Sequence, residues 1–390
     1  MELTETQRMI RETIRDYMTR EVEPLVPEME AERLLPYDPL RKMVADLGLG
    51  RGGELSATIA ESPAEESLKL FVPRVLAIEM SRVCAGFALS HGATVGLAAG
   101  NIRSKGTEEQ KKRWATPLLR LEKIGAWALT EPQAGSAAIR DMKARAVRDG
   151  DYYVLNGTKT FITNAPYADI FVVYAKLQQN GSSSAQAFIC ERGDPGLETG
   201  KPFKKMGFKS SPTGEVFLSD CRIPADRLLG GEPSERGAVR ERLSRERIGL
   251  QAISYGILER AFEIALQYAR DRHQGGQPIG NYQLVQRRLA RMYMALTNAR
   301  AYVFADIVAS PAGRPLGGSV ADASVGKLYV AEMASYVATE AIHILAGNGY
   351  MEEFVVERLL RDAKLIELGG GTTEIQELTA GRWLVEHYEI

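Results

Sequence analysis

The sequence of 390 residues has few of the side chains that build disulfide frameworks and metal sites. Its three cysteines, Cys84, Cys190 and Cys221, are scattered and form no CxxC pair. Its four histidines show no metal-ligand spacing. We therefore expect the cysteines to be reduced residues of the core or of strands in a cytoplasmic protein, and we expect no metal site.

The sequence also lacks an excess of charge and a long apolar run. Lysine and arginine number 49 against 50 acidic residues, and no basic stripe stands out, which argues against a nucleic-acid partner. No apolar run approaches the ~18–20 residues that span a bilayer. The N-terminal residues MELTETQRMIRETIRDY are charged and helical in pattern, unlike a signal or transit peptide. We expect neither a nucleic-acid nor a membrane function.

The hydrophobic pattern changes twice along the chain. Residues 1–124 have a helical pattern, with capping boxes at Thr4–Gln7 and Thr107–Gln110. Residues 125–233 carry short alternating and β-branched runs separated by turn residues, which predicts a small antiparallel β domain, a barrel or a sandwich. The runs expected to be strands lie at residues 124–130, 152–163, 169–177, 185–191 and 215–223. In residues 234–390 apolar side chains recur every three or four positions, which predicts a four-helix bundle. The expected fold is α+β with three domains, and neither a P-loop nor a GxGxxG fingerprint is present.

Four short motifs lie at the expected ends of these elements. TEPQAGS (Thr130–Ser136) and FITN (Phe161–Asn164) end two strands, GNGY (Gly347–Tyr350) follows a helix, and GGGTTEIQ (Gly369–Gln376) joins two helices. Glycines allow a backbone to approach a ligand closely, and Thr372 or Thr373 could cap the last helix, whose first N–H groups suit an anion. Each motif alone is equally compatible with ordinary turn chemistry.

In this order and spacing, the four motifs resemble those of the acyl-CoA dehydrogenase family, and the resemblance covers nearly the whole chain. It implies that FAD lies between the β domain and the C-terminal bundle. It also implies α,β-dehydrogenation of an acyl-CoA thioester, with electrons passing to an electron-transfer flavoprotein. Family members are mostly homotetramers built as pairs of dimers, so we expect a homotetramer or a dimer.

The resemblance also implies which residues contact the cofactor. Thr130 matches a threonine near flavin N1 and O2, and Thr163 matches one near N5. Ser136 matches a serine near the pyrophosphate and the thioester arm of the substrate, and Phe161 stands where the family often has tryptophan. Arg272 matches an arginine that reaches the FAD of a neighbouring subunit. The remaining positions assigned to the cofactor are His343, Gly347, Thr372 and Glu374.

The catalytic base does not follow the commonest family pattern. Most members place a glutamate in the glycine turn, but this chain has Gly370 there, which cannot act as a base. One branch of the family, including isovaleryl-CoA and long-chain acyl-CoA dehydrogenases, carries the base on the first long C-terminal helix, directly before an arginine. Glu246 and Arg247 match that pair, although a charge run such as RERLSRERIG alone would predict a solvated face. The backbone N–H of Gly370 would then hold the thioester carbonyl oxygen.

The acyl group is the least constrained part of the prediction. Gly369 replaces the bulky residue that commonly precedes the catalytic turn, which makes room for a branched or cyclic acyl chain, and Thr94 could line the same pocket. A short branched or alicyclic acyl-CoA is the first expectation. A linear chain, or an acyl group on a carrier protein, remains open.

Other positions depart from the family pattern. Ala137 replaces the aspartate after the TEP motif, Gly275 replaces a phenylalanine, and His343 and Ala346 replace a glutamine and a glycine near the neighbour's FAD. A PEEYGG-like segment is not recognisable in residues 51–60. These differences indicate a less typical subfamily.

Three other functions are compatible with such a fold. A flavin-dependent monooxygenase would use the same architecture, but Glu246 and the motif Thr130–Pro132 argue against it. An acyl-CoA oxidase differs in oxygen access, which the sequence does not show. An acyl-CoA-binding protein without catalytic activity is the third alternative.

Overall fold

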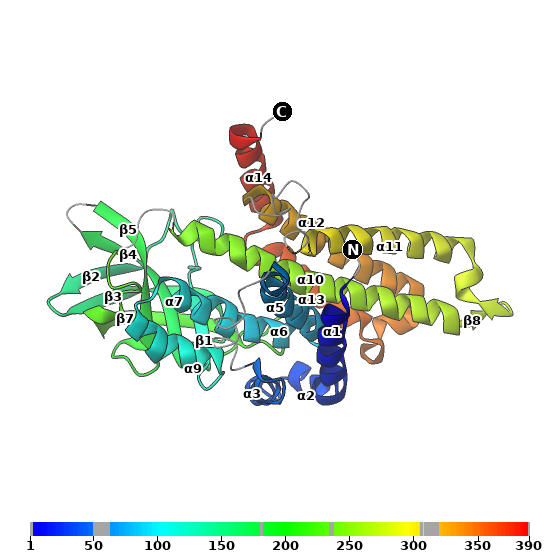
Figure 1. The fold of residues 1–390 in the computed structure, drawn as a ribbon, viewed down its shortest axis with the longest axis horizontal. Helices are drawn as coiled ribbons and strands as arrows, with labels where there is room; N and C mark the ends of the chain where they lie inside the picture. The colour runs from blue at the N-terminus through cyan, green and yellow to red at the C-terminus, as the bar shows by residue number, and fades with distance from the viewer. Residues whose placement is uncertain are drawn as a thin grey trace.

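The computed structural model describes residues 3–49, 63–179, 182–233, 238–304, 307 and 320–388. Within these ranges a helical part, a β-sheet and a second helical part follow one another along the chain (Figure 1). This order confirms the predicted α+β fold. The loop expected at Gly50–Pro63, including residues 51–60, lies outside the described residues except for Pro63, where a helix begins.

The first helical part consists of short helices around one long one. The α-helices are α1 (Glu5–Tyr17), α2 (Val26–Glu30), α3 (Tyr37–Asp46), α5 (Pro63–Val83), α6 (Ala85–His91), α7 (Gly100–Lys105), α8 (Glu108–Gln110) and α9 (Thr116–Leu119). Tighter or wider helical turns form η1 (Met18–Val22), η2 (Glu23–Leu25), η4 (Gly92–Ala99) and η5 (Lys111–Ala115). Both predicted capping boxes are present, at Thr4–Gln7 and Thr107–Gln110.

The sheet has seven strands: β1 (Gly125–Ala128), β2 (Arg145–Asp149), β3 (Tyr152–Thr163), β4 (Ile170–Gln179), β5 (Ser182–Glu191), β6 (Leu197–Thr199) and β7 (Thr213–Pro224). The order is β1-β4-β2-β3-β7-β6, and β5 pairs with the other edge of β4. β1 and β2 pair parallel with β4, so the sheet is mixed and not wholly antiparallel as predicted. The antiparallel β2–β3 hairpin lies between β1 and β4 in the sequence. After this hairpin the chain enters β4, which runs beside β1 in the same direction.

The second helical part contains α10 (Ala238–Asp271), α11 (Gln283–Val303), α12 (Val320–Leu345), α13 (Val356–Leu368) and α14 (Thr373–His387). Short elements are η6 (Ala225–Arg227), β8 (His273–Gln274), β9 (Gln277–Pro278), η7 (Ile279–Asn281), η8 (Ala346–Tyr350) and η9 (Glu352–Phe354). α10 packs against α5, α11, α12 and α13, and α12 also packs against α14. The helices α10, α11, α12 and α13 therefore form the predicted four-helix bundle. α14 projects from the body as a further helix (Figure 1).

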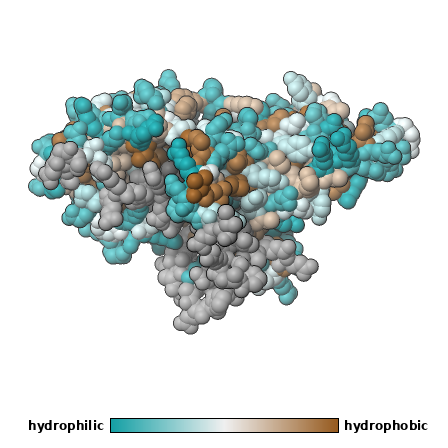
Figure 2. All heavy atoms as spheres, turned by 90° about the horizontal axis from the view of Figure 1, so that it is seen from above, coloured by the Kyte–Doolittle hydropathy of each residue, from teal (hydrophilic) through white to brown (hydrophobic). Residues whose placement is uncertain are grey.

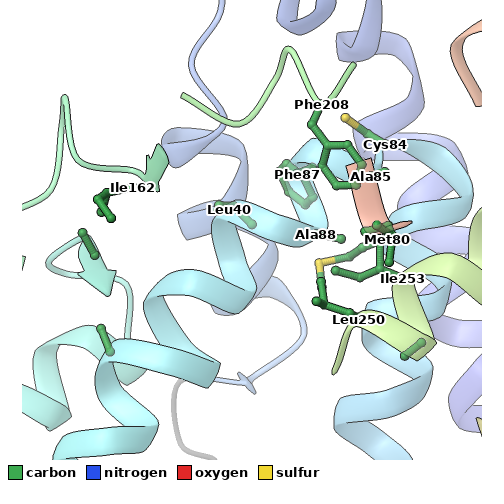
Figure 3. Close-up of a cluster of buried hydrophobic side chains, with 14 of the residues drawn as sticks. Leu40, Met80, Cys84, Ala85, Phe87, Ala88, Ile162, Phe208, Leu250 and Ile253 are labelled. Carbon is green, nitrogen blue, oxygen red and sulfur yellow. The ribbon is translucent and has the colours of Figure 1, made fainter. Parts of the chain in front are cut away.

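One hydrophobic core joins the three parts. Figure 3 shows Leu250 and Ile253 of α10 beside Met80 of α5, with Phe208 of the loop before β7 packed near Phe87 of α6. The same loop is fixed to α13, because Asp362 accepts a hydrogen bond of 2.6 Å from the Phe208 backbone N–H. The sheet is thereby held against the helix that leads into the glycine turn.

Candidate active site

The glycine turn connects α13 to α14 in a backbone conformation that favours glycine. Gly370 has φ 65° and Gly371 has φ 92°, both in the left-handed region. The Gln376 amide donates to the carbonyls of Gly370 (2.9 Å) and Gly371 (3.0 Å), and Lys327 Nζ donates to the Gly371 carbonyl (2.7 Å). No described residue accepts a hydrogen bond from the Gly370 N–H. The turn thus has engaged carbonyls and an N–H that can bind a ligand oxygen.

The carboxyl group of Glu246 lies beside this turn, although the two are far apart in the sequence. A Cβ atom on Gly370 would lie 3.8 Å from Glu246 Cδ and would collide with Leu250 Cδ1. The space that a turn side chain would need is therefore taken by α10. The structure brings together the predicted base, Glu246, and the predicted backbone donor, Gly370.

The surroundings of Glu246 suit a proton acceptor near neutral pH. Burial raises the pKa of Glu246 to about 7, while the charges of Arg247 and Lys327 act in the opposite direction. Burial also lowers the pKa of Lys327 to about 8. A carboxyl group with a pKa near the working pH can both accept and return a proton.

Arg247, the residue next to Glu246, points to the inside of the bundle. It is buried, and its Nη1 donates to Ser324 Oγ on α12 over 3.2 Å. Its Nε has no hydrogen-bond partner among the described residues. Burial lowers the pKa of Arg247, and the carboxylate of Glu246 opposes this effect. The guanidinium therefore keeps donor capacity close to the candidate base.

The predicted flavin contacts meet at neighbouring strand ends. The Thr160 N–H donates to the carbonyl of Thr130 over 3.0 Å, which ties the end of β1 to the end of β3. Phe161 has φ 57° and a side chain that is 69% exposed, with its ring centroid 5.8 Å from that of Phe203. Thr163 is half-buried two residues further on. The end of β3 therefore carries an exposed aromatic ring close in the chain to a half-buried threonine.

A buried ion pair fixes the turn after β1. Glu131 accepts hydrogen bonds from the backbone N–H groups of Lys143 (2.6 Å) and Ala144 (2.9 Å) and from Lys159 Nζ (2.8 Å). Hydrogen bonds and the positive charge of Lys159 hold the pKa of Glu131 below its usual range despite burial. Ser136 lies exposed in the loop that this pair anchors. The sequence analysis did not identify the pair.

Thr94 has a position that the sequence did not indicate. Its side chain is buried, and its hydroxyl accepts from the Gly125 N–H (3.2 Å) and from Asn164 Nδ2 (3.1 Å). These bonds join η4 to the starts and ends of strands. The hydroxyl is engaged by the protein, and a contact of Thr94 with substrate stays a prediction.

The residues assigned to a neighbour's cofactor are exposed and lie away from these strand ends. Arg272 follows α10 directly before β8, at the opposite end of the molecule from the sheet (Figure 1). His343, near the end of α12, lies 3.3 Å from Glu340 and 3.2 Å from Arg288. Gly347 is also exposed. One chain alone does not bring these residues to Phe161.

The last two assigned positions begin α14. Thr372 is the N-cap residue by backbone geometry, but its side chain makes no capping bond to the backbone. Instead, the backbone N–H of Glu374 and the Thr372 hydroxyl both hydrogen-bond the Glu374 carboxylate and hold its pKa below the usual range. A side chain of α14 itself therefore accepts a hydrogen bond from one of the N–H groups in the first turn of this helix.

Lys327 and Gln376 were missed, although their side chains shape the turn. Both are fully buried, with 0% exposure. The sequence contained a signal for Lys327: extending the apolar spacing of α12 backwards by three residues from the buried Val330 reaches this lysine. A lysine on the buried face of a helix requires an acceptor.

Among the described residues no group of three histidine, cysteine or acidic side chains could hold a metal ion. No helix in the described part of the chain is long and apolar enough to cross a membrane. The three cysteines are free and buried, and Cys190 and Cys221 lie on β5 and β7.

Comparisons with known proteins identify the family. Models of the acyl-CoA dehydrogenase N-terminal, middle and C-terminal domains match residues 4–122, 126–221 and 236–385. The chain is 37% identical to the "Probable acyl-CoA dehydrogenase YngJ" of Bacillus subtilis, with 99% of each chain covered. It is 35% identical to the mitochondrial isovaleryl-CoA dehydrogenase of Pongo abelii, covering 97% of this chain and 89% of that protein. The structure of butyryl-CoA dehydrogenase from Megasphaera elsdenii superposes with a TM-score of 0.88 at 32% identity, with 99% of both chains covered. The chain belongs to the acyl-CoA dehydrogenase family and is an oxidoreductase acting on acyl-CoA.

Proposed function

We propose that this enzyme uses FAD and Glu246 to convert an acyl-CoA thioester to the trans-2-enoyl-CoA. The observation that carries the proposal is the position of the Glu246 carboxyl group, whose pKa is about 7, beside the glycine turn. In this proposal Glu246 removes the α-proton, while the N–H of Gly370 donates a hydrogen bond to the thioester oxygen on which charge develops.

The residues at the strand ends fit FAD. The exposed face of Phe161 offers a surface for an aromatic ring system, and the hydroxyls of Thr130, Thr163 and Ser136 offer hydrogen bonds to its polar edge and phosphates. When bound, FAD would accept the hydride. Thr372 and Glu374, at the start of α14, complete the proposed cofactor set within one chain.

We propose a short branched or cyclic acyl group as substrate. At Gly369 an added Cβ atom would have only the Leu365 carbonyl oxygen within 4 Å, at 3.4 Å. The missing side chain therefore leaves space next to the turn, and a wider acyl group would use it. The likeness to isovaleryl-CoA dehydrogenase supports this choice. Arg247, with its free Nε, and Ser136 are the proposed polar contacts of the thioester arm.

We propose a homotetramer, or a dimer, in which Arg272, His343 and Gly347 complete the FAD site of a neighbour. Large apolar side chains are exposed on α11 and α14, including Leu284 (72%), Met294 (59%) and Val385 (90%). Figure 2 shows a patch of hydrophobic side chains on an otherwise mostly hydrophilic face. Such surfaces are typical of subunit contacts. Sedimentation velocity of the FAD-bound protein should therefore give a species of four or two chains, and a monomer would contradict this.

We also propose three domains, with limits at residues 1–124, 125–233 and 234–390. We propose further that an electron-transfer flavoprotein accepts the electrons and that the enzyme is cytoplasmic. The change from helix to strand between Leu119 and Gly125 supports the first boundary. The free, buried cysteines suit a reducing compartment.

Anaerobic titration of the purified yellow protein with straight, branched and cyclic acyl-CoAs tests the function. We expect bleaching of the flavin absorbance, most complete with short branched or cyclic acyl groups, and an enoyl-CoA product. Colourless protein, or a flavin that no acyl-CoA bleaches, would favour a binding protein. Oxygen consumption with a hydroxylated product would indicate a monooxygenase, and fast peroxide formation would indicate an oxidase.

A further inference from the structure

We propose that Lys327 is a positioning residue of the active site, which fixes the glycine turn through a hydrogen bond and favours the ionised form of Glu246 through its charge. The proposal rests on the function proposed above. It assigns a role to a side chain on α12, a helix whose one predicted site residue, His343, lies near its far end and away from the turn.

The first part of the argument is the hydrogen-bonding of the turn. Lys327 Nζ donates to the Gly371 carbonyl over 2.7 Å and to the Glu367 carbonyl over 3.4 Å. One ammonium group thus connects the last turn of α13 to the residue after Gly370. Gln376 binds the same Gly371 carbonyl. Lys327 and Gln376 together bind the carbonyls of Gly370 and Gly371. These bonds stabilise the left-handed conformations of the two glycines and so fix the position of the Gly370 N–H.

The second part of the argument is that residue 327 is a charged lysine, although an uncharged N–H donor could also bind the Gly371 carbonyl. The side chain is 0% exposed, and holding a charge there has a cost that needs compensation. Glu246 approaches the position next to Gly371, so the ammonium and the carboxyl group flank the same turn. Opposite charges that flank one turn in a water-poor site stabilise each other's ionised forms, and each of these two groups has that effect on the other.

The charged groups around this pair come from several helices. Arg247 on α10 acts on both groups, favouring the carboxylate and disfavouring the ammonium. Glu332 on α12 and Glu367 on α13 favour the ammonium. Glu374 on α14 is itself affected by Lys327. Within this set, Lys327 is the group that both contacts the turn and acts on the base.

Three substitutions in the FAD-bound enzyme separate the two roles. Lys327→Gln removes the charge but keeps an N–H donor, Lys327→Met removes both, and Lys364→Met is the control. Lys364 lies on α13 near the turn, but its side chain is half exposed and pairs with Glu367. The first measurement is the rate of anaerobic flavin reduction at saturating acyl-CoA as a function of pH.

We expect both Lys327 variants to move the rise of this rate to higher pH by roughly 0.5–1 unit, because the Glu246 carboxylate loses a neighbouring positive charge. We expect the plateau at high pH to fall about 10-fold or more in Lys327→Met and less in Lys327→Gln, since only the latter can still hold the Gly371 carbonyl. Lys364→Met should match the wild type in both respects. A fall in rate without a shift in pH dependence would show a merely structural role and overturn the proposal.

A second measurement needs no substrate turnover. The infrared carboxyl stretch of Glu246, assigned by its loss in Glu246→Gln, is titrated in the wild type and in Lys327→Gln. A higher apparent pKa in the variant supports the proposal, and an equal pKa contradicts it. If no acyl-CoA bleaches the wild type, the proposed function fails, but this titration still decides whether Lys327 acts on Glu246. If Lys327→Met does not fold, Lys327→Gln carries both measurements.

Discussion

The carboxyl carbon of Glu246 lies 3.8 Å from the place that a Cβ atom on Gly370 would occupy. Such a Cβ atom would touch Glu246 and would collide with Leu250, which lies on the same helix, so α10 occupies the space that a turn side chain would need. The rest of the site is arranged around that choice, with the turn reduced to backbone and its carbonyls bound by Gln376 and Lys327.

Flavin reduction should depend on pH through Glu246. Since burial raises the pKa of this group to about 7, half of it is protonated and inactive as a base at that pH. The rate constant for reduction by saturating acyl-CoA should rise tenfold per pH unit below about pH 6 and level off above about pH 8. Stopped-flow reduction between pH 5 and 9 measures this. A profile that is flat across the range would contradict the assignment.

The two neighbouring glycines should respond differently to alanine. Gly370→Ala places a Cβ against Leu250 at φ 65°, so we expect a lower melting temperature and at least a ~10-fold slower reduction. Gly369 has φ −77° and an open Cβ position, so Gly369→Ala should retain the wild-type melting temperature. Thermal melting and flavin reduction of the pair provide the comparison. Equal behaviour of the two variants would show that the turn does not depend on its backbone conformation.

Filling the space at Gly369 should change the acyl preference. Gly369→Leu restores a bulky side chain at this position, and we expect it to slow reduction by branched and cyclic acyl-CoAs by roughly 10–100-fold relative to straight chains. The ratio of kcat/KM for isovaleryl-CoA and butyryl-CoA measures the change, with Gly369→Ala as the smaller step. An unchanged ratio in Gly369→Leu would place the acyl chain elsewhere.

The raised pKa of Glu246 also predicts a pH dependence of stability. The folded state holds this proton up to a pKa of about 7, above the ordinary glutamate value of 4.5, so its stability falls as pH rises from about 4.5 through 7. The shift corresponds to at most about 3 kcal/mol. Glu246→Gln, which cannot ionise, should therefore melt a few degrees higher than the wild type at pH 8, and close to it at pH 5. A variant that melts lower than the wild type at pH 8 would contradict this sign.

Much of the fold could be predicted from local patterns. The run expected at residues 152–163 is β3, with the same bounds, and the capping boxes at Thr4 and Thr107 form as expected. The strands β2 and β6 were missed because they are short and largely exposed, so they lack an apolar alternation. The parallel pairing of β1 with β4 depends on the path of the intervening hairpin, which periodicity does not encode.

The site was only partly accessible from the sequence. The resemblance in motif order led to Glu246 and Gly370, whereas the local charge run predicted a solvated face. Lys327 was not identified, since its acceptor lies on a turn more than 40 residues away in the sequence. Glu131 lies in the turn after β1 and Lys159 lies on β3, so the two become partners only when the sheet forms. Contacts of this kind are set by tertiary packing and not by sequence spacing.

The central claim is that Glu246 is the base, and Glu246→Gln tests it most directly. The variant should bind FAD and acyl-CoA, but anaerobic reduction of its flavin should be slower than in the wild type by a factor on the order of 10³ or more. Glu12→Gln, a change of an exposed carboxylate on α1, is the matched control and should reduce at close to the wild-type rate. Near-normal flavin reduction in FAD-bound Glu246→Gln would contradict the account.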